Sequence, residues 1–252
     1  MLLATGCVRS NYNLATHQEE YTLTSTQKEI DMGRTLAKQV NKELEIVQDE
    51  SVQARVRTLG QRLAAVCDRQ ELIYEFTVVH DEEVNAFSLP GGYVFVNDGL
   101  INNTKSDDEL AAVLAHEIGH IAARHAVKRY ETSIGAQLVQ LASLAAARQG
   151  DVARGVGIAI QATRLAYARE DELAADRLGV KYLKAAGFDP TAALRMLEHL
   201  HAVDQQKTHY LPRGVRPQYA QTHPYVPERI RAVKEALYGV ADYVDYLNTT
   251  PQ

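Results

Sequence analysis

Two histidines and a glutamate stand together in the segment HEIGH at residues 116–120. Residues four apart lie on one face of an α-helix, so the rings of His116 and His120 can bind the same metal ion. Glu117 follows the first of them, where its carboxylate can reach a water molecule on that ion. A zinc ion lowers the pKa of such a water toward neutrality, and a glutamate can accept its proton as the water attacks a carbonyl group. The spacing therefore predicts a zinc-dependent hydrolytic site.

The residues around this segment favour a buried site over a pair of surface histidines. Leu114, Ala115, Ile118 and Ile121 surround the two rings, whereas two solvent-facing histidines beside an acid would need no apolar neighbours. A buried histidine pair without a ligand is costly because its polar groups lack partners. Gly119 lowers helix stability by about 1 kcal/mol relative to alanine. We therefore expect another backbone to approach closely at this glycine.

A catalytic zinc ion needs a third ligand from the protein. In the pattern H-E-x-x-H-x-x-G-x-x-H a third histidine comes from the same segment. That pattern fails here, because Ala123 and Ala126 occupy the glycine and histidine positions. His125 lies one place short and faces another side of the helix, so we predict that it lies at the surface or supports a ligand from behind.

The other source of a third ligand is an acidic stretch, AREDELAADRLG at residues 168–179. Its Glu172 and Asp176 are four apart and share one helix face. Glu172 can then bind zinc while Asp176 accepts a hydrogen bond from a ligand histidine and fixes its tautomer. The alternative is a solvated acidic face, which the HEIGH segment makes the less favoured interpretation.

The elements that must position these residues are mainly helices. Helical spacing and capping residues predict helices at about 26–44, 50–67, 107–129, 132–148, 152–186, 190–203 and 227–238. β-branched and aromatic residues predict strands at 74–80 and 93–97, separated by a connection rich in turn residues. Residues 204–226 contain three prolines among polar residues and predict a long loop. The expected fold class is therefore mainly α, α+β, with only a small sheet.

The motifs together resemble a family of zinc endopeptidases, the one that includes the CAAX prenyl endopeptidases, the heat-shock protease HtpX and the periplasmic BepA. HEIGH, the pair Glu172 and Asp176, and NAFSLPGGYVFVNDGL at residues 85–100 carry the resemblance, which covers about residues 26–238. It implies a zincin-like helical domain with a small β-sheet or hairpin beside the metal-binding helix.

The same resemblance implies the roles of four residues. His116, His120 and Glu172 would hold one zinc ion per chain in a gluzincin-like arrangement, and Glu117 would be the general base. The sequence shows neither the transmembrane helices of the prenyl and heat-shock branches nor the helical repeats of the BepA branch. We therefore expect the likeness to concern the peptidase core.

A later segment, THPYVPERI at residues 222–230, resembles the His-Pro segment of that family. By this resemblance His223 stabilises the oxyanion, or binds the metal as a fourth ligand that shuts the enzyme off. Arg229 would steady developing negative charge. Residues 205–225 would then form a lid over the cleft, as their length and prolines indicate.

The predicted strand at 93–97 precedes the metal helix and suggests how a substrate binds. A peptide can pair with the free edge of a strand, and neighbouring glycines would let its backbone come close. The expected substrate-binding residues are Gly91, Gly92, Tyr93, Val94 and Phe95. The alternative, an ordinary hairpin strand, needs no substrate.

Charge and composition limit the classes of partner that this protein can bind. The chain has 252 residues and a formal net charge of -5, without a basic block, which argues against nucleic acid. The longest apolar candidate, residues 134–147, is too short for a transmembrane helix and contains glutamines.

The first residues suggest an anchor. MLLATGC ends at Cys7, and its last residues resemble the lipobox that bacteria cleave before they lipidate the cysteine. The basic start and most of the apolar stretch of a signal peptide are missing, so either the start is truncated or the match is chance. Of the two interpretations we favour a polar tether at residues 1–25 that is lipidated at Cys7, followed by a metallopeptidase domain at 26–240 and a tail at 241–252. This would place the protein in the bacterial periplasm or on a membrane facing it.

The sequence thus predicts a zinc endopeptidase that cuts polypeptides, such as misfolded envelope proteins. The alternative is a zinc-stabilised chaperone or scaffold that binds unfolded chains and cuts them rarely. Such a protein could lose Glu117 and keep its zinc ligands, yet this chain retains Glu117. A purely structural zinc site is less favoured, because three protein ligands leave an open position.

Overall fold

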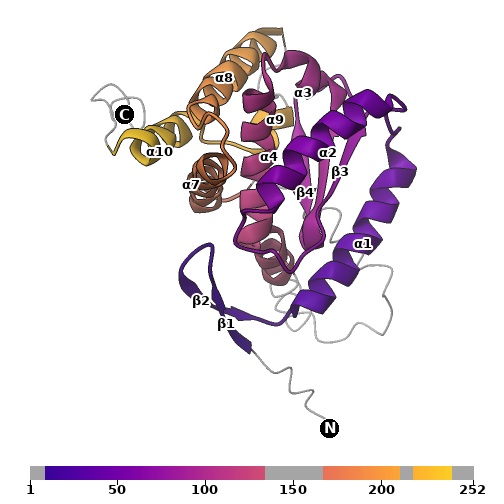
Figure 1. Cartoon of the computed structure of the whole chain (residues 1–252), viewed down its shortest axis with the longest axis vertical. Coiled ribbons are helices and arrows are strands. Elements are labelled where there is room, and N and C mark those ends of the chain that lie inside the picture. The colour runs from indigo at the N-terminus through magenta and orange to yellow at the C-terminus, as the bar shows by residue number, and fades with distance from the viewer. Residues whose placement is uncertain (1–8, 134–166, 211–217, 240–252) are drawn as a thin grey trace, which may run out of the picture.

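The fold is built around α4 (Asp107–Ala122), the helix that carries the HEIGH segment. Ser106 caps this helix, because its hydroxyl accepts a hydrogen bond from the backbone N–H of Glu109 at 3.2 Å. Every residue from Glu109 to Ala122 is buried. A helix that is buried all round must be covered on all sides. The rest of the chain accordingly packs around α4 (Figure 1).

The computed structural model describes residues 9–133, 167–210 and 218–239. Besides α4, its elements are β1 (Arg9–Asn13), β2 (Gln18–Thr22), α1 (Thr26–Glu43), α2 (Glu50–Ala64), β3 (Glu75–Val79), β4 (Ala86–Leu89), the 3-10 turn η1 (Pro90–Gly92), β5 (Tyr93–Asn97), α3 (Asp98–Asn103), α7 (Arg169–Ala185), α8 (Ala192–Tyr210), α9 (Gln218–Thr222) and α10 (Val226–Tyr238). Residues 125–133 are also helical. The predicted class, mainly α with a small sheet, is confirmed.

The sheet beside α4 has three strands in the order β3-β5-β4. β5 pairs in parallel with β3, with Val94 opposite Phe76, and antiparallel with β4, with Val94 opposite Ser88. The sequence prediction missed β4 and assigned its residues to the connection. It also expected a free edge at 93–97, which is wrong because β5 is hydrogen-bonded on both sides. Residues 94–97 are all buried, so both faces of β5 are covered as well.

Two layers enclose α4. α2 and the sheet lie against one side of it, and α7 and α8 lie against the other (Figure 1). The helices α4 and α7 come very close at Gly119, where a Cβ atom would lie 2.8 Å from the carbonyl oxygen of Ala175. The close backbone approach predicted at this glycine is confirmed, and it sets the distance between the HEIGH segment and the acidic helix.

The N-terminal stretch differs from the expected tether. Residues 9–22 contain the antiparallel hairpin β1–β2, which docks on the C-terminal end of α4. The Asn13 side chain donates to the carbonyl oxygen of Ala122 at 3.2 Å, and Lys128 lies 2.8 Å from the carboxylate of Glu20. Through these contacts, polar residues of the N-terminal stretch are bound to the helical domain. Cys7 lies outside the described residues.

Several helix ends also differ from the prediction. α4 stops at Ala122, because Arg124 takes a left-handed conformation with φ 56°, and a new helix starts at residue 125. The acidic helix α7 begins only at Arg169, so the helix predicted over 152–186 does not run through residues 167–168. α8 continues to Tyr210, well into the predicted loop and lid. The predicted helix at 132–148 lies almost entirely outside the described residues.

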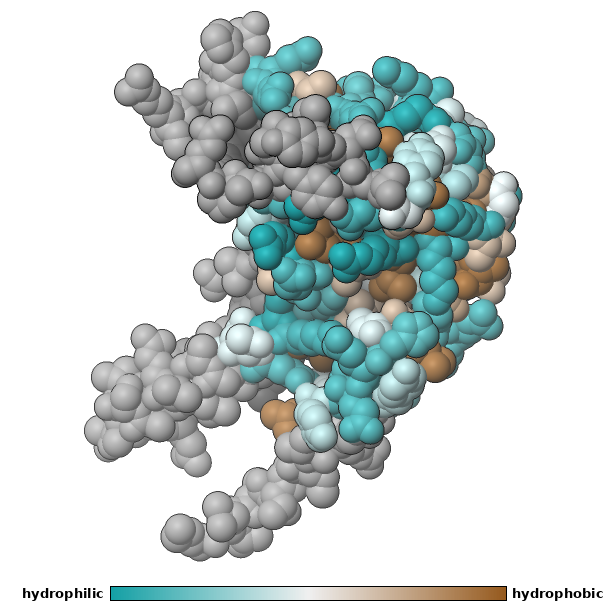
Figure 2. Space-filling view, turned by 90° about the vertical axis from the view of Figure 1, so that its left-hand side faces the viewer, coloured by the Kyte–Doolittle hydropathy of each residue, from teal (hydrophilic) through white to brown (hydrophobic). Residues whose placement is uncertain are grey.

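The described surface carries no membrane-spanning element. Among residues 9–133, 167–210 and 218–239, no helix is long and apolar enough to cross a bilayer. Figure 2 shows that the face of the molecule on the left of Figure 1 is mostly hydrophilic, with small and separate apolar areas. Scattered apolar groups of this kind are ordinary on a protein surface.

Candidate metal centre

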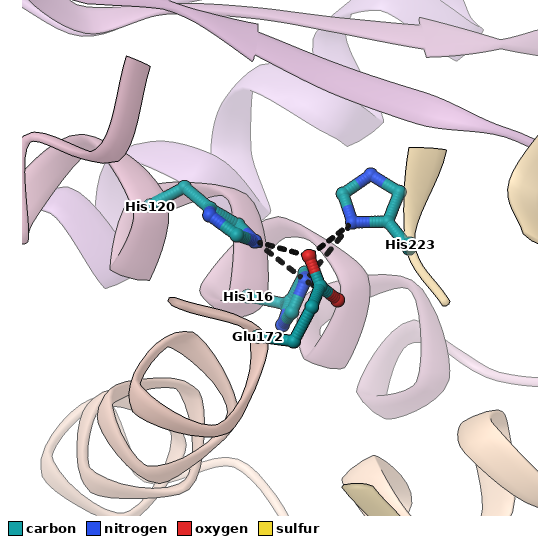
Figure 3. Close-up of side chains that lie close together, drawn as sticks. All are labelled: His116, His120, Glu172 and His223. Atoms are coloured by element: carbon teal, nitrogen blue, oxygen red, sulfur yellow. Dashed lines mark hydrogen bonds and ion pairs between the residues drawn. The ribbon is translucent and has the colours of Figure 1, made fainter. Parts of the chain in front are cut away.

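Four side chains from three parts of the chain converge in one buried cluster (Figure 3). His116 and His120 come from α4, Glu172 from α7, and His223 from the turn between α9 and α10. Their ligand atoms all lie within 4.8 Å of one another. The Nε2 atom of His120 lies 3.0 Å from Nε2 of His116 and 3.3 Å from a carboxylate oxygen of Glu172. The Nδ1 atom of His223 lies 3.1 Å from the same oxygen.

Asp176 and Arg229 hold the cluster from behind. The Nδ1 atom of His116 lies 2.8 Å from a carboxylate oxygen of Asp176. Arg229 binds Asp176 through two nitrogens, each at 2.8 Å, and lies 2.9 Å from Glu172. Its remaining contacts are with the Tyr219 hydroxyl at 2.8 Å and with the ring of His116. The guanidinium, 1% exposed, is therefore committed to these partners.

The charges in the cluster are strongly coupled. Burial and the neighbouring His116 lower the pKa of His120 to about 3. Burial and Arg229 act against a charge on His116, yet the carboxylates of Asp176 and Glu172 outweigh both and raise its pKa to about 9. Burial alone would raise the pKa of Glu172, but Arg229 and His223 hold it well below its usual value. The two carboxylates thus favour positive charge on the His116 side of the cluster.

This arrangement fits a metal ion. Two imidazoles and a carboxylate are a zinc ligand set, and their donor atoms face one another instead of pointing to separate partners. In neutral His116 the proton lies on Nδ1, which faces Asp176, so Nε2 presents its lone pair to the cluster. A divalent cation bound there would be held by all three donors at once.

Glu117 lies beside the cluster without joining it. Its side chain is buried, and Oε1 lies 3.6 Å from Nε2 of His223. Its other oxygen, Oε2, has no hydrogen-bond partner among the described residues. Buried carboxylate oxygens without partners are uncommon, and they suggest a task other than holding the fold together.

Two tyrosines that the sequence analysis did not single out hold His223 in the cluster. The Tyr219 ring stacks on the His223 ring with centroids 5.1 Å apart, and the Tyr219 carbonyl accepts from the His223 N–H at 2.7 Å. The Tyr167 N–H donates to the carbonyl of Thr222 at 3.2 Å. The Tyr167 ring also stacks on His120, with centroids 3.7 Å apart. The only local indication of a role for Tyr219 is its position four residues before His223, on the short helix α9.

His125 is buried, 2% exposed, so the prediction that it lies at the surface is wrong and the alternative prediction, support of a ligand, fits its position. Its Nδ1 atom lies 2.9 Å from Nδ1 of His120. A helix continuous through residues 120–125 would have turned it to another face. The break at Arg124 brings it back.

The expected substrate-binding glycines contact the protein itself. A Cβ atom on Gly91 would lie 2.9 Å from Cα of Ile30, and one on Gly92 would lie 2.3 Å from the carbonyl oxygen of Ile73. Their φ angles, 78° and 107°, allow the tight η1 turn between β4 and β5. Together with the central position of β5, this corrects the expectation that residues 91–95 offer a free edge to a peptide. β4 is the edge strand beside α4.

A comparison with protein-family models matches residues 50–237 to Peptidase family M48. The matched range includes every member of the cluster and most of the chain. The chain belongs to peptidase family M48. Its class is therefore that of a metalloendopeptidase, a hydrolase.

Named relatives agree with this membership. The chain is 29% identical over 239 residues to the beta-barrel assembly-enhancing protease of Yersinia pestis, which covers 88% of the chain and 48% of that protein. It is 31% identical over 239 residues to the putative beta-barrel assembly-enhancing protease of Vibrio cholerae, with 89% and 48% covered. It is 35% identical over 181 residues to the mitochondrial metalloendopeptidase OMA1 of Schizosaccharomyces pombe, with 70% and 50% covered. The chain thus spans about half the length of these relatives.

Proposed function

We propose that this chain is a zinc-dependent endopeptidase with one zinc ion per chain. The observation that supports this most directly is the buried convergence of His116, His120 and Glu172, with a carboxylate oxygen of Glu117 beside it that lacks a partner among the described residues. Three protein ligands leave one position for water or substrate, as in catalytic zinc sites. A bound zinc ion would polarise the scissile carbonyl and activate a water molecule.

Glu117 is the general base in this proposal. Its carboxylate accepts the proton of the attacking water and later delivers it to the nitrogen of the leaving amine. Asp176 keeps a proton on Nδ1 of His116, so that the opposite ring nitrogen presents its lone pair. Arg229 balances the charges of Asp176 and Glu172. Because its N–H groups already have these partners, we assign Arg229 to positioning the ligands and not to direct contact with the reacting carbonyl.

His223 acts as a cap that keeps the site closed. Its Nδ1 atom lies 3.1 Å from Glu172, and its Nε2 atom faces Glu117 at 3.6 Å. The ring therefore occupies the space between the general base and the ligands, which a substrate carbonyl and its water would need. This supports the fourth-ligand role over a role at the oxyanion, and the segment around His223 must move before a peptide can be cut.

The substrates that we propose are unfolded or misfolded polypeptides of the bacterial envelope, met in the periplasm. The support comes from the relatives that are named for β-barrel assembly. Lipidation at Cys7 would add an anchor on a membrane facing that compartment. The chaperone alternative gains nothing from the site, because binding of unfolded chains requires neither Glu117 nor an open ligand position.

Cleavage by wild type and Glu117→Gln tests the proposed function. We expect wild type to cut casein or itself and Glu117→Gln to lose at least 100-fold in rate, because the amide cannot accept the proton. Zinc content, measured by elemental analysis, must match between the two proteins. Equal rates at equal zinc content would exclude the peptidase mechanism.

His223→Ala tests the cap. We expect this variant to cut faster than wild type, because removal of the ring opens the space between Glu117 and the ligands. His201→Ala, a histidine on α8 outside the cluster, serves as the matched control and should leave the rate unchanged. An unchanged or lower rate in His223→Ala, with the fold intact by circular dichroism, would reject the capping role.

A further inference from the structure

The two ligand histidines on α4 are supported in different ways. His116 contacts a carboxylate directly, at 2.8 Å from Asp176. His120 contacts a second imidazole, that of His125, at 2.9 Å between the two Nδ1 atoms. The other nitrogen of His125, Nε2, lies 3.4 Å from a carboxylate oxygen of Asp171. A chain of three side chains therefore runs from the metal cluster outward.

The backbone break after α4 makes this chain possible, and other contacts hold the break in place. Arg124 has φ 56°, a conformation that costs a residue other than glycine of order 1 kcal/mol. Its side chain donates to the carbonyl of Thr24 at 2.6 Å and lies 3.1 Å from the buried carboxylate of Glu29. These contacts fix the start of the helix at 125–133, and with it the direction in which the His125 ring points.

The contacts allow a single assignment of the protons. Nε2 of His120 faces Glu172 and His116 in the cluster, so it must carry the lone pair that binds a metal ion. The proton of neutral His120 is then on Nδ1, and His125 must accept it at its own Nδ1. The proton of neutral His125 is then on Nε2, the nitrogen that lies 3.4 Å from a carboxylate oxygen of Asp171. Any other placement leaves two lone pairs or two N–H groups facing each other.

Asp171 forms the outer end of this chain. Its side chain is 24% exposed, whereas the His125 side chain is 2% exposed. It lines a polar groove between the turn of β1–β2, the helix at 125–133 and α7, together with Lys128 and Arg177. The acidic residues at the start of α7 therefore have two different tasks. Glu172 enters the cluster, and Asp171, one residue earlier, supports it from the opposite side.

We infer that His125 and Asp171 are positioning residues that hold His120 in the tautomer required for metal binding and thereby set the metal affinity of the site. This rests on the proposed function only in that His120 binds the metal. Residues that orient a metal ligand in this way typically change metal affinity by about 10–100-fold when they are replaced. The structure gives this task to a histidine that belongs to no recognised ligand pattern.

Zinc affinity of the full chain tests the inference, measured by competition with a fluorescent chelator. We expect His125→Leu, which fills the space without a ring nitrogen, to bind zinc about 10–100-fold more weakly than wild type. His125→Asn places an amide oxygen near the lost Nδ1 and should recover part of the affinity. Val127→Ala, another buried position on the same short helix, is the matched control and should bind as wild type does.

A second measurement uses the wild-type protein alone, so it does not depend on whether a variant folds. Long-range ¹H–¹⁵N spectra of the zinc-loaded wild type should show His120 protonated at Nδ1 and His125 protonated at Nε2. A His125 protonated at Nδ1, or equal zinc affinity in His125→Leu and Val127→Ala, would overturn the inference. Zinc binding without any cleavage would defeat the proposed peptidase and leave this inference standing. Absence of zinc binding in wild type would defeat both.

Discussion

Replacing Gly119 by alanine tests whether the contact between α4 and α7 sets the geometry of the metal centre. In an isolated helix this change would stabilise by about 1 kcal/mol. Here the new Cβ atom would lie 2.8 Å from the carbonyl oxygen of Ala175 and 3.1 Å from its Cα atom. Both atoms belong to the backbone and cannot rotate away, so the helices must separate by several tenths of an ångström. Overpacking typically costs about 1–3 kcal/mol, and a contact with rigid backbone atoms places this site at the upper end of that range.

The expected balance for Gly119→Ala is a net loss of about 2 kcal/mol, which corresponds to a fall of roughly 4–8 °C in Tm for a chain of this size. Because α7 carries Glu172, zinc affinity should fall as well. Urea denaturation with and without zinc measures the first effect, and chelator competition measures the second. Gly179→Ala is the matched control. Its Cβ atom would lie 3.3 Å from the backbone nitrogen of His116, a contact that needs only a slight adjustment. If the Gly119→Ala protein is as stable as wild type and binds zinc equally well, the contact between α4 and α7 does not set the geometry of the metal centre.

Two further predictions concern the buried charges and the metal. Glu29 is fully buried and pairs with Arg69 at 2.8 Å and with Arg124 at 3.1 Å. Glu29→Gln should lower the free energy of unfolding by about 3 kcal/mol, because the charges of the two buried arginines lose their partner. An unchanged urea denaturation curve would contradict this. Removing zinc with a chelator should lower Tm, and zinc at 100 times its Kd should restore about 2.7 kcal/mol, or roughly 5–11 °C. His120→Ala should show no such response, and a wild-type Tm indifferent to zinc would speak against the site.

Local pattern was sufficient for most of the long helices and for the residue pairs that they contribute to the site. The i, i+4 spacing of His116 and His120 follows from helix geometry alone, and the same holds for Glu172 and Asp176 on α7. The cap of α4 is likewise a local feature, because the hydroxyl of Ser106 accepts from the backbone N–H of Glu109, three residues along the chain. Each of these features depends on neighbours within one or two turns, which a single sequence displays directly.

Strand order could not be predicted in the same way. The run YVFVN predicts a strand, but its partners β3 and β4 are chosen by the packing of the whole sheet. A strand of only four residues such as β4 gives a weak signal, and the turn residues next to it concealed it further. The edges of the sheet are therefore β3 and β4, and not β5 as expected.

Sequence pattern is enough to name the candidate metal ligands on α4 and α7 and the candidate general base, because metal binding and proton transfer require specific side chains at helical spacing. Which distant groups join them depends on the tertiary fold. His223 reaches the cluster from a turn more than fifty residues beyond Glu172, and it is held there by stacking on Tyr219. His125 reaches His120 only because buried contacts of Arg124 stabilise a left-handed break after α4. Helical periodicity is a property of the local chain, whereas such breaks and docked turns are stabilised by contacts with remote segments and so appear only in the folded molecule.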